Sequence, residues 1–413
     1  MRGRGLKLIF AGMILVFSCG SITGQDRDFH YNFLNLQENR FHNLENTLHH
    51  RKFKAMLKDA GKAGSGNIHM VHIGDSHMQA GFFPNRIRMN LQRQLATDTL
   101  PNLGFIFPYA VAKTNNPANY AVSWSGNWST CKAMERDAPC PLGLSGITLT
   151  TRDSVASITI RLRDHFPSVR YKIQKARLFC HYPESGYQLE LNGIQTRQQE
   201  NEGWLEASFP GPTDTLRIKI RKKETGSSGM FSISGITLTR DRHGLNYHAI
   251  GVNGAKASSY LRCKHLPSQL ASLNPNGVIV SLGTNEAYNT HFDPRLFHEH
   301  LSRLVETIRE QTPETWILLT TPGDALREGK LYNPNNHKAR RTVIQVAREQ
   351  NCAYWDFFKV MGGEHSILSW YYSGLTARDK LHLNKRGYQL KADLFFEAFL
   401  SSLKPSSATK TSN

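Results

Sequence analysis

The spacing of hydrophobic positions divides the chain into a mixed first part, a strand-rich middle and a mixed last part. In the first part, residues 68–73 form a short apolar run that is followed by a glycine. Apolar side chains then recur four positions apart, as on one face of a helix: Phe83, Ile87, Leu91 and Leu95. This order predicts a strand, a sharp turn and a helix. The polar stretch at about 42–60 predicts a lead-in helix packed on the same domain.

The middle of the chain, from about Ser145 to Asp241, has the spacing of strands. Short segments separated by Gly, Pro and Asn predict strands at 155–162, 176–181, 187–191, 204–209, 215–220 and 231–239. In one of them Leu216, Ile218 and Ile220 alternate with cationic residues. Such alternation indicates a β-sandwich with one charged face. That face could be merely solvated, or it could bind a ligand.

The mixed pattern returns at Tyr247 and continues through the last predicted helix. Apolar runs predict strands at 278–282, 316–320 and 353–357. One helix is predicted to start at Asp293 and Pro294. Two further helices are predicted at about 336–350 and 385–403. Strands that alternate with helices indicate an α/β fold whose parallel sheet is covered by helices on both faces.

The order of these patterns predicts an α/β domain interrupted by a β-sandwich. The 413 residues exceed one ordinary domain, which agrees with this division. We expect the α/β domain to comprise residues 25–122 and 243–405, and the inserted β-sandwich residues 123–242. The Ser-, Thr- and Lys-rich tail at 406–413 is predicted to be disordered.

Residues 1–24 have the order of a signal peptide. The basic residues Arg2, Arg4 and Lys7 precede an apolar run, 8–17, that is too short to span a bilayer. Two processing sites are open: a bacterial lipobox ending at Cys19, which would be acylated, or a cut after Gly24. Either one predicts an exported protein, in the periplasm or as an outer-membrane lipoprotein of a bacterium. The only expected membrane contact is this lipid anchor.

The charge of the chain points to an anionic partner. The 51 Lys and Arg residues exceed the 33 Asp and Glu residues by 18, so the surface should attract polyanions. No basic helix, zinc-finger spacing or RNA-binding aromatic signature is present, and we therefore expect no nucleic-acid partner. An anionic cell-wall polymer or membrane surface fits an exported protein better.

The six cysteines are too few to provide a disulfide framework for a chain of this length. Cys131 and Cys140 could close a small loop. The widely spaced Cys180, Cys263 and Cys352 are expected to be buried thiols rather than metal ligands. We expect no metal and no cofactor.

The first candidate for chemistry is Ser76, at the junction of the first predicted strand and helix. A serine there is exposed above the carboxyl edge of a sheet, beside unpaired helix N-terminal amides that can bind an oxyanion. Asp75 or Ser76 could instead simply cap the helix. The Gly-Asp-Ser triplet alone does not decide between these interpretations.

Three further polar stretches also follow predicted strands, where open α/β sheets place their sites. In chain order the four stretches are Gly74-Asp75-Ser76-His77, Gly251-Val252-Asn253-Gly254-Ala255, Gly283-Thr284-Asn285-Glu286 and Asp379-Lys380-Leu381-His382. This ordered set resembles the SGNH (GDSL-type) hydrolases. The resemblance implies a three-layer, flavodoxin-like α/β sheet.

The resemblance also implies a role for each of these residues. Ser76 would be the nucleophile, His382 the general base and Asp379 the carboxylate that orients it. The amides of Ser76 and Gly254 and the side chain of Asn285 would form the oxyanion hole. These roles agree with chemistry, because serine needs a base to take its proton and the base needs a carboxylate to fix its tautomer.

Two positions depart from the common family pattern and suggest a narrower resemblance. His77 and Glu286 stand where many members have Leu and Asp. With the β-insert after the first stretch, they resemble the peptidoglycan O-acetylesterases, whose insert is a jelly-roll-like β-sandwich similar to carbohydrate-binding modules. The resemblance implies a serine esterase that removes O-acetyl groups from peptidoglycan. Asp75, His77 and Glu286 would be supporting residues, although His77 could simply be a core residue.

Other functions remain open from the sequence. An O-acetyltransferase would use the same three residues, an acetyl esterase could act on another glycan, and a glycan-binding protein could retain the fold without catalysis. In each case the insert should help to hold a polymer, through aromatic or cationic side chains: Trp124, Trp128, Tyr187, Trp204, Lys219, Arg221, Lys222 and Lys223. These aromatic residues could instead be sandwich core. The oligomeric state is not predicted.

Overall fold

The computed structural model describes residues 30–45, 48–59, 66–95, 102–135, 137–163, 170–181, 186–196, 203–223, 229–240 and 244–404. The chain divides into two compact units, 1–31 and 32–413, and every described helix and strand lies in the second. The predicted signal peptide at 1–24, with Cys19, and the predicted tail at 406–413 lie outside the described residues. No described helix is long and apolar enough to cross a membrane.

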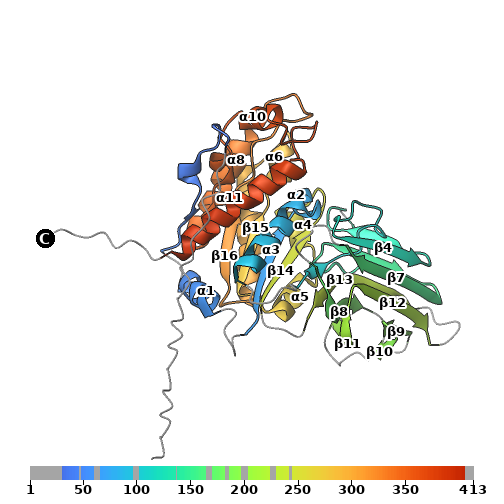
Figure 1. The fold of residues 1–413 in the computed structure, drawn as a ribbon. Coiled ribbons are helices and arrows are strands. Elements are labelled where there is room, and N and C mark those ends of the chain that lie inside the picture. The colour runs from blue at the N-terminus through green and yellow to red at the C-terminus, as the bar shows by residue number, and fades with distance from the viewer. Residues whose placement is uncertain are drawn as a thin grey trace, which may run out of the picture. The chain divides into compact units, whose positions relative to one another are not determined.

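A six-stranded sheet forms the centre of the α/β domain (Figure 1). Its order is β1 (Phe41–His42), β17 (Ala353–Trp355), β16 (Trp316–Thr320), β15 (Gly277–Ser281), β2 (Ile68–Gly74) and β14 (Leu245–Gly251). All neighbours are parallel except the edge strand β1, which is antiparallel to β17. The chain therefore enters the sheet through the short strand β1, which includes His42, the residue at which the predicted lead-in helix over 42–60 is expected to begin. The lead-in helix α1 is shorter (Leu48–Asp59).

Helices cover both faces of this sheet (Figure 1). One group comprises α1, α3 (Phe82–Leu95) and α11 (Lys385–Leu403); the other comprises α4 (Ala257–Leu261), α5 (Leu266–Leu273), α7 (Pro294–Gln311) and α8 (Asn335–Glu349). Helix α7 shows how the local sequence sets an element. Asp293 caps it by accepting a hydrogen bond from the Arg295 amide at 2.8 Å, and Pro294 occupies its first turn. The side chains at the predicted spacing, among them Phe297 and Leu304, are buried.

The insert consists of two antiparallel sheets whose inward side chains share one buried core. The first sheet has the order β10 (Ile194–Thr196), β9 (Tyr187–Leu191), β12 (Thr215–Lys222), β7 (Val155–Leu162) and β4 (Tyr120–Ser125). The second has the order β11 (Trp204–Thr213), β8 (Ile173–His181), β13 (Phe231–Thr239), β6 (Ile147–Thr151) and β5 (Ser129–Lys132), and β3 (Gly104–Ile106) also pairs with β13. The predicted α/β fold with an inserted β-domain is confirmed.

The boundary predicted at residue 123 is too late in the chain. Strands β3 and β4 begin before it, yet both pair with strands of the insert. The segment that contains β4 and β5 is rich in Asn, which strands disfavour, and most side chains of the two strands are not buried. Pairing with β7 and β6, which are distant in sequence, supplies the missing hydrogen bonds.

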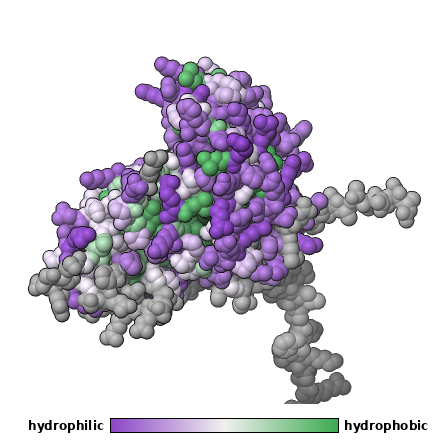
Figure 2. Space-filling view, turned by 180° about the vertical axis from the view of Figure 1, so that it is seen from behind, coloured by the Kyte–Doolittle hydropathy of each residue, from purple (hydrophilic) through white to green (hydrophobic). Residues whose placement is uncertain are grey.

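The alternation predicted for 215–220 is present in β12. Leu216, Ile218 and Ile220 are buried, and the cations between them face solvent. The face of the molecule seen in Figure 2 is mainly hydrophilic, with hydrophobic residues exposed in small patches. Cys131 and Cys140 form a disulfide, and Cys180, Cys263 and Cys352 are buried free thiols, as predicted.

The aromatic residues proposed to be exposed on the insert differ from one another. Tyr187 is buried, with its ring 5.9 Å from that of Phe231, so its prediction as an exposed residue is wrong. Trp204 is partly buried beneath the Arg177 guanidinium, 3.9 Å from the ring centroid. Trp128 is partly buried, and Trp124 is 46% exposed. Of these four residues, Trp124 has the most surface available for a ligand.

Candidate active site

Ser76 lies at a sharp strand-to-helix turn. Strand β2 ends at Gly74, and the short helix α2 (Ser76–Gln79) starts at Ser76. A side chain at Gly74 would place its Cβ 2.3 Å from Met78 Cγ, so the turn requires glycine. Asp75 caps α2, because its Oδ1 accepts a hydrogen bond from the His77 amide at 2.9 Å. The capping interpretation therefore holds for Asp75 and leaves the Ser76 hydroxyl free for other contacts.

The structure brings Ser76, His382 and Asp379 into one chain of hydrogen bonds. Ser76 Oγ lies 2.9 Å from His382 Nε2, and His382 Nδ1 lies 2.7 Å from Asp379 Oδ2. In this arrangement the carboxylate holds the proton on Nδ1, so that Nε2 can accept the serine proton. The three side chains come from two segments that are about 300 residues apart, since Ser76 and His382 are separated by 306 positions.

A tight loop holds Asp379 and His382 in register. An isolated bridge joins Thr376 to Leu383, and Lys380 has a φ of +48°, which few non-glycine residues adopt. The second carboxylate oxygen of Asp379 accepts hydrogen bonds from the amides of Leu381 and His382 at 3.0 and 2.9 Å. Burial would raise the pKa of Asp379, but the hydrogen bonds from His382 and Leu381 outweigh it and lower that pKa. Asp379 is therefore ionised at neutral pH.

Two backbone amides near Ser76 are available to a ligand. In the described part of the chain, neither Ser76 N–H nor Gly254 N–H donates to a protein acceptor. Gly254 has a φ of +78°, and a Cβ there would meet only Met134 Cγ at 3.8 Å. Glycine is therefore needed at this turn for its backbone conformation rather than for space.

Asn285, the third predicted oxyanion donor, is already engaged. It lies in α6 (Thr284–Tyr288), and its Nδ2 donates to Ala255 O at 3.0 Å and to Asp75 Oδ2 at 3.4 Å. The contact to Asp75 is long for a hydrogen bond and is the weaker of the two. Asn285 would thus have to exchange the Asp75 contact for an oxyanion. Asp75 therefore has two partners: its Oδ2 contacts Asn285, the predicted oxyanion donor, and its Oδ1 accepts from the His77 amide in the helix that starts with Ser76.

Gln79 is a site residue that the sequence analysis missed. Its side chain is buried; its Oε1 accepts from the Asn253 amide at 2.8 Å, and its Nε2 donates to Thr114 Oγ1 at 3.0 Å. Gln79 therefore ties the Gly254 loop to the helix that begins with Ser76. Its position one turn after the nucleophile was the only available signal.

Of the predicted supporting residues, Asp75 and Glu286 are buried beneath the site, and His77 is partly buried. His77 Nδ1 lies 2.9 Å from Tyr388 OH, and burial lowers the pKa of His77 well below its usual value. Burial raises the pKa of Glu286 to about 7, and its Oε1 accepts from the Ala257 amide at 2.7 Å. Glu286 thus connects the loops of Gly254 and Asn285. The lowered pKa makes His77 neutral, and its partly buried ring lies 5.2 Å from that of His382.

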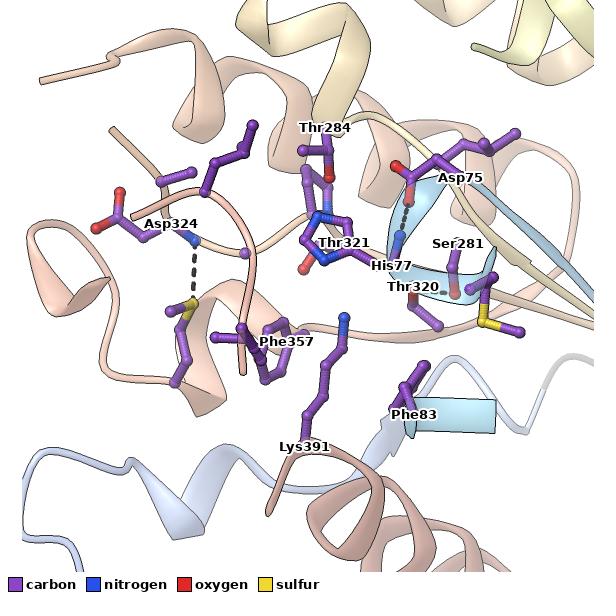
Figure 3. A pocket seen from close by; sticks show the side chains of 18 of the residues that line it. Asp75, His77, Phe83, Ser281, Thr284, Thr320, Thr321, Asp324, Phe357 and Lys391 are labelled. Atoms are coloured by element: carbon purple, nitrogen blue, oxygen red, sulfur yellow. Dashed lines mark hydrogen bonds between the residues drawn. The ribbon is translucent and has the colours of Figure 1, made fainter. Parts of the chain in front are cut away.

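A cavity of about 30 Å³ lies behind the nucleophile, with Asp75 and His77 on its wall (Figure 3). Lys391, from α11, is 7% exposed and extends into this cavity. Its ammonium lies 4.7 and 4.2 Å from the ring centroids of Phe83 and Phe357. No oxygen of the described residues accepts a hydrogen bond from it.

Lys391 and Asp75 influence each other's ionisation. Burial lowers the pKa of Lys391 to about 8, and the Asp75 carboxylate opposes this effect. Burial raises the pKa of Asp75 to about 6, and Lys391 opposes that shift. The buried cation therefore favours the ionised Asp75 that accepts hydrogen bonds from His77 N and Asn285 Nδ2.

We expect this pair to produce an alkaline limb in the rate of ester hydrolysis. Lys391 is charged below its pKa, so its charge is present at neutral pH and is lost as the pH rises through about 8. Asp75 then loses its counter-charge, and kcat should fall. Lys391→Met should show a lower plateau without this limb, measured as kcat against pH. Lys385→Met, at an exposed position of the same helix, should keep the limb; a limb that persists in Lys391→Met would contradict the assignment.

No group of three or more His, Cys, Asp or Glu residues in the described ranges is arranged to hold a metal ion. The arrangement instead has the parts of acyl transfer: a hydroxyl, a base with its carboxylate, and amides beside the hydroxyl.

Comparisons with known proteins agree with this arrangement. Residues 235–390 match the model of the GDSL-like lipase/acylhydrolase family, a range that includes Gly254, Asn285, Asp379 and His382 but not Ser76. A solved structure entitled "Peptidoglycan O-acetylesterase in action" has a TM-score of 0.69 and 22% identity, and the match covers 87% of this chain and 97% of that chain. No curated protein matches the sequence.

Two further solved structures match less well. An acetylxylan esterase from Geobacillus stearothermophilus is 19% identical with a TM-score of 0.30, covering 40% of this chain and 74% of its own. A mutant family two carbohydrate esterase from Clostridium thermocellum is 10% identical with a TM-score of 0.30, covering 69% and 98%. These two scores support no conclusion about this chain.

The predicted resemblance to SGNH hydrolases is confirmed by the family match and by the shared fold. The chain is thus similar to GDSL-like acylhydrolases, in a form that contains an inserted β-domain. The solved structure that matches 87% of the chain is that of a peptidoglycan O-acetylesterase, and at 22% identity it establishes the fold alone.

Proposed function

We propose that the protein is an exported serine esterase that removes O-acetyl groups from a cell-wall polysaccharide, most directly peptidoglycan. The main observation is the hydrogen-bonded chain from Ser76 Oγ through His382 to Asp379, with distances of 2.9 and 2.7 Å. Two unengaged amides beside Ser76 complete the requirements of acyl transfer.

The reaction would proceed through an acetyl-enzyme. Ser76 Oγ attacks the acetyl carbonyl carbon while His382 Nε2 takes the serine proton, and the amides of Ser76 and Gly254 bind the oxyanion. Collapse of the tetrahedral intermediate breaks the bond to the sugar oxygen, which leaves with the proton from His382. Water then attacks the acetyl group, again giving its proton to His382, and acetate and free Ser76 result.

The choice of substrate rests on coarser support. The solved peptidoglycan O-acetylesterase shares the fold along 87% of this chain, insert included. The net charge of +18 favours an anionic polymer, and peptidoglycan carries peptide carboxylates. The predicted signal peptide would deliver the enzyme to the compartment of that polymer, as a soluble protein or as a lipoprotein modified at Cys19.

An acetyltransferase would use the same acetyl-enzyme, with a sugar hydroxyl in place of water. Product analysis separates the two: the protein is incubated with an O-acetylated glycan, with and without a second, unacetylated glycan. We expect free acetate in equal amounts in both reactions. Transfer of most acetyl groups to the acceptor would instead establish a transferase, and no release at all would contradict both. A purely glycan-binding protein has no need of the complete hydrogen-bonded triad.

The insert should contribute to binding of an insoluble polymer through Trp124, which is 46% exposed on β4. Trp124→Ala should lower activity on insoluble O-acetylated peptidoglycan severalfold more than activity on a small acetyl ester, because a flat aromatic face is lost. Val155→Ala, at a 49% exposed position of the neighbouring strand β7, serves as a control. If the ratio of activity on peptidoglycan to activity on the small ester were the same in Trp124→Ala as in the wild type, Trp124 would not contribute to polymer binding and the insert would have only a structural role.

A further inference from the structure

Exposed tyrosines gather around the loop that holds Asp379 and His382. Tyr372 is 83% exposed, and Tyr288, Tyr332 and Tyr371 are each between 36 and 37% exposed. Tyrosine is usually more buried than this, because its ring is largely apolar. We refer to Tyr288, Tyr332, Tyr371 and Tyr372 as the tyrosine rim.

Contacts connect the rim into a single surface. Lys380 Nζ lies 4.4 Å from the ring centroid of Tyr371, and the ring of Tyr371 lies 5.5 Å from that of Tyr372. The same Lys380 Nζ donates to Gly329 O at 3.0 Å. Next to Gly329, the Glu328 amide donates to Tyr288 OH at 3.1 Å. These contacts link Tyr288 on α6 with Tyr371 and Tyr372 on α10 (Ser366–Tyr372). The ring of Tyr332 packs against His365, which immediately precedes α10, with ring centroids 4.7 Å apart.

The rim adjoins the groups proposed to perform the chemistry. Lys380 directly follows Asp379, and its carbonyl accepts from the Leu326 amide at 3.0 Å, which ties the 325–332 segment to the triad loop. Tyr288 is the last residue of the short helix that contains Asn285. Figure 1 shows α6 and α10 at the same end of the sheet as α2, the helix that starts with Ser76.

Exposed cations occur in the same loops and helix ends as the rim and the triad. Lys330, Arg378 and Lys385 are exposed, and none of them pairs with a carboxylate among the described residues. Arg378 immediately precedes the triad residue Asp379. Acidic residues in the same segments are Glu328, Glu364 and Asp379, of which Asp379 is already bonded to His382. The surface thus combines flat aromatic faces with excess positive charge.

We propose that the tyrosine rim is a binding surface for an anionic glycan chain, located on the α/β domain itself. The apolar faces of sugar rings would pack on the tyrosine rings, phenol hydroxyls would bond sugar hydroxyls, and Lys330 and Arg378 would pair with carboxylates of the polymer. A chain held there would present an O-acetyl group to Ser76 from the side of Asn285. The substrate class in this proposal rests on the proposed function. The new element is that residues beside the triad, rather than the insert alone, bind the polymer.

Binding can be tested without turnover. The protein with Ser76→Ala is sedimented with insoluble peptidoglycan, and the bound fraction is measured against polymer concentration. Adding Tyr372→Ala or Tyr371→Ala should weaken binding about tenfold, as loss of an aromatic contact does. The matched control is Met56→Ala, because Met56 is also exposed, at 40%, but lies on α1 beside Asn276, which precedes β15. It should bind as the parent does.

Charge variants and other polymers show whether the affinity comes from ion pairs with an anionic glycan. Lys330→Ala and Arg378→Ala should weaken binding and reduce its dependence on salt, as expected for lost ion pairs. Affinity for a neutral glycan equal to that for peptidoglycan would overturn the anionic assignment, and preference for single-stranded nucleic acid would overturn the glycan assignment.

Kinetics separate this proposal from the catalytic one. In the protein with Ser76 intact, Tyr372→Ala should raise KM for O-acetylated peptidoglycan about tenfold with a smaller effect on kcat. If Ser76 is not the nucleophile, the sedimentation result still stands. If the tyrosine variants bind normally and Trp124→Ala alone loses binding, the insert holds the polymer and the rim proposal fails.

Discussion

Replacement of Ser76 by alanine should lower kcat for a small acetyl ester by about 10⁴-fold or more, since the acetyl-enzyme can no longer form. Ser76 Oγ contacts His382 Nε2 at 2.9 Å, and the turn is held by Gly74 and by the Asp75 cap rather than by the hydroxyl. The melting temperature should therefore stay close to that of the wild type. Steady-state kinetics and a thermal melt measure both quantities.

The control for Ser76→Ala is Ser268→Ala, an exposed serine on α5 that donates only to a local carbonyl, His265 O. It should retain full activity. Turnover close to wild type in a normally folded Ser76→Ala protein would exclude Ser76 as the nucleophile.

Replacement of His382 by alanine should be about as damaging as Ser76→Ala, because no other base among the described residues contacts the serine hydroxyl. The members of such a triad act as a unit, so the double variant should lose little more than either single one. Asp379 is expected to keep its loop in place through the amide of Leu381, at 3.0 Å. The rates of the wild type, both single variants and the double variant are compared at one pH.

If the fold-loss of kcat in the double variant equalled the product of the two single fold-losses, Ser76 and His382 would act independently, contrary to their shared hydrogen bond. A His382→Ala protein that regains activity with added imidazole would support the role of general base. The control is His291→Ala, a histidine of an exposed loop that contacts Thr290.

The local parts of the site were predictable from sequence. Ser76 follows an apolar run and precedes a helical spacing, so its place at a strand end depends only on neighbouring residues. Asp379 and His382 are three positions apart and meet within one loop. Parallel strands then bring these loops to the same edge of the sheet, whatever their separation along the chain.

The parts that sequence could not predict depend on register between distant segments. The contact of Asn285 with Asp75 joins residues 210 positions apart, and Gln79 binds Asn253 across 174 positions. Lys391 occurs in α11, a helix with many buried side chains, and only packing shows that its ammonium lies against two phenylalanine rings instead of in solvent. Spacing within one helix does not reveal which neighbour covers it.

The insert shows the same limit for strands. Alternation correctly separated the buried and exposed residues of β12, where three cations mark the solvent side. The same alternation is present in β9, where Leu189 and Leu191 alternate with Gln188 and Glu190, and this pattern places Tyr187 on the side of the buried leucines. Its ring lies inside the sandwich against Phe231. Strands β4 and β5 were missed because they are short and most of their side chains are not buried, so no regular alternation of buried and exposed residues marks them.

The most direct test of the account is the identity of the residue that a serine-reactive phosphonate modifies. We predict that inactivation by the phosphonate coincides with one label per protein on the peptide that contains Ser76, that O-acetylated peptidoglycan slows the labelling, and that His382→Ala slows it strongly. Complete loss of activity with the label on any other residue, or with Ser76 unmodified, would contradict the assignment of Ser76 as the nucleophile.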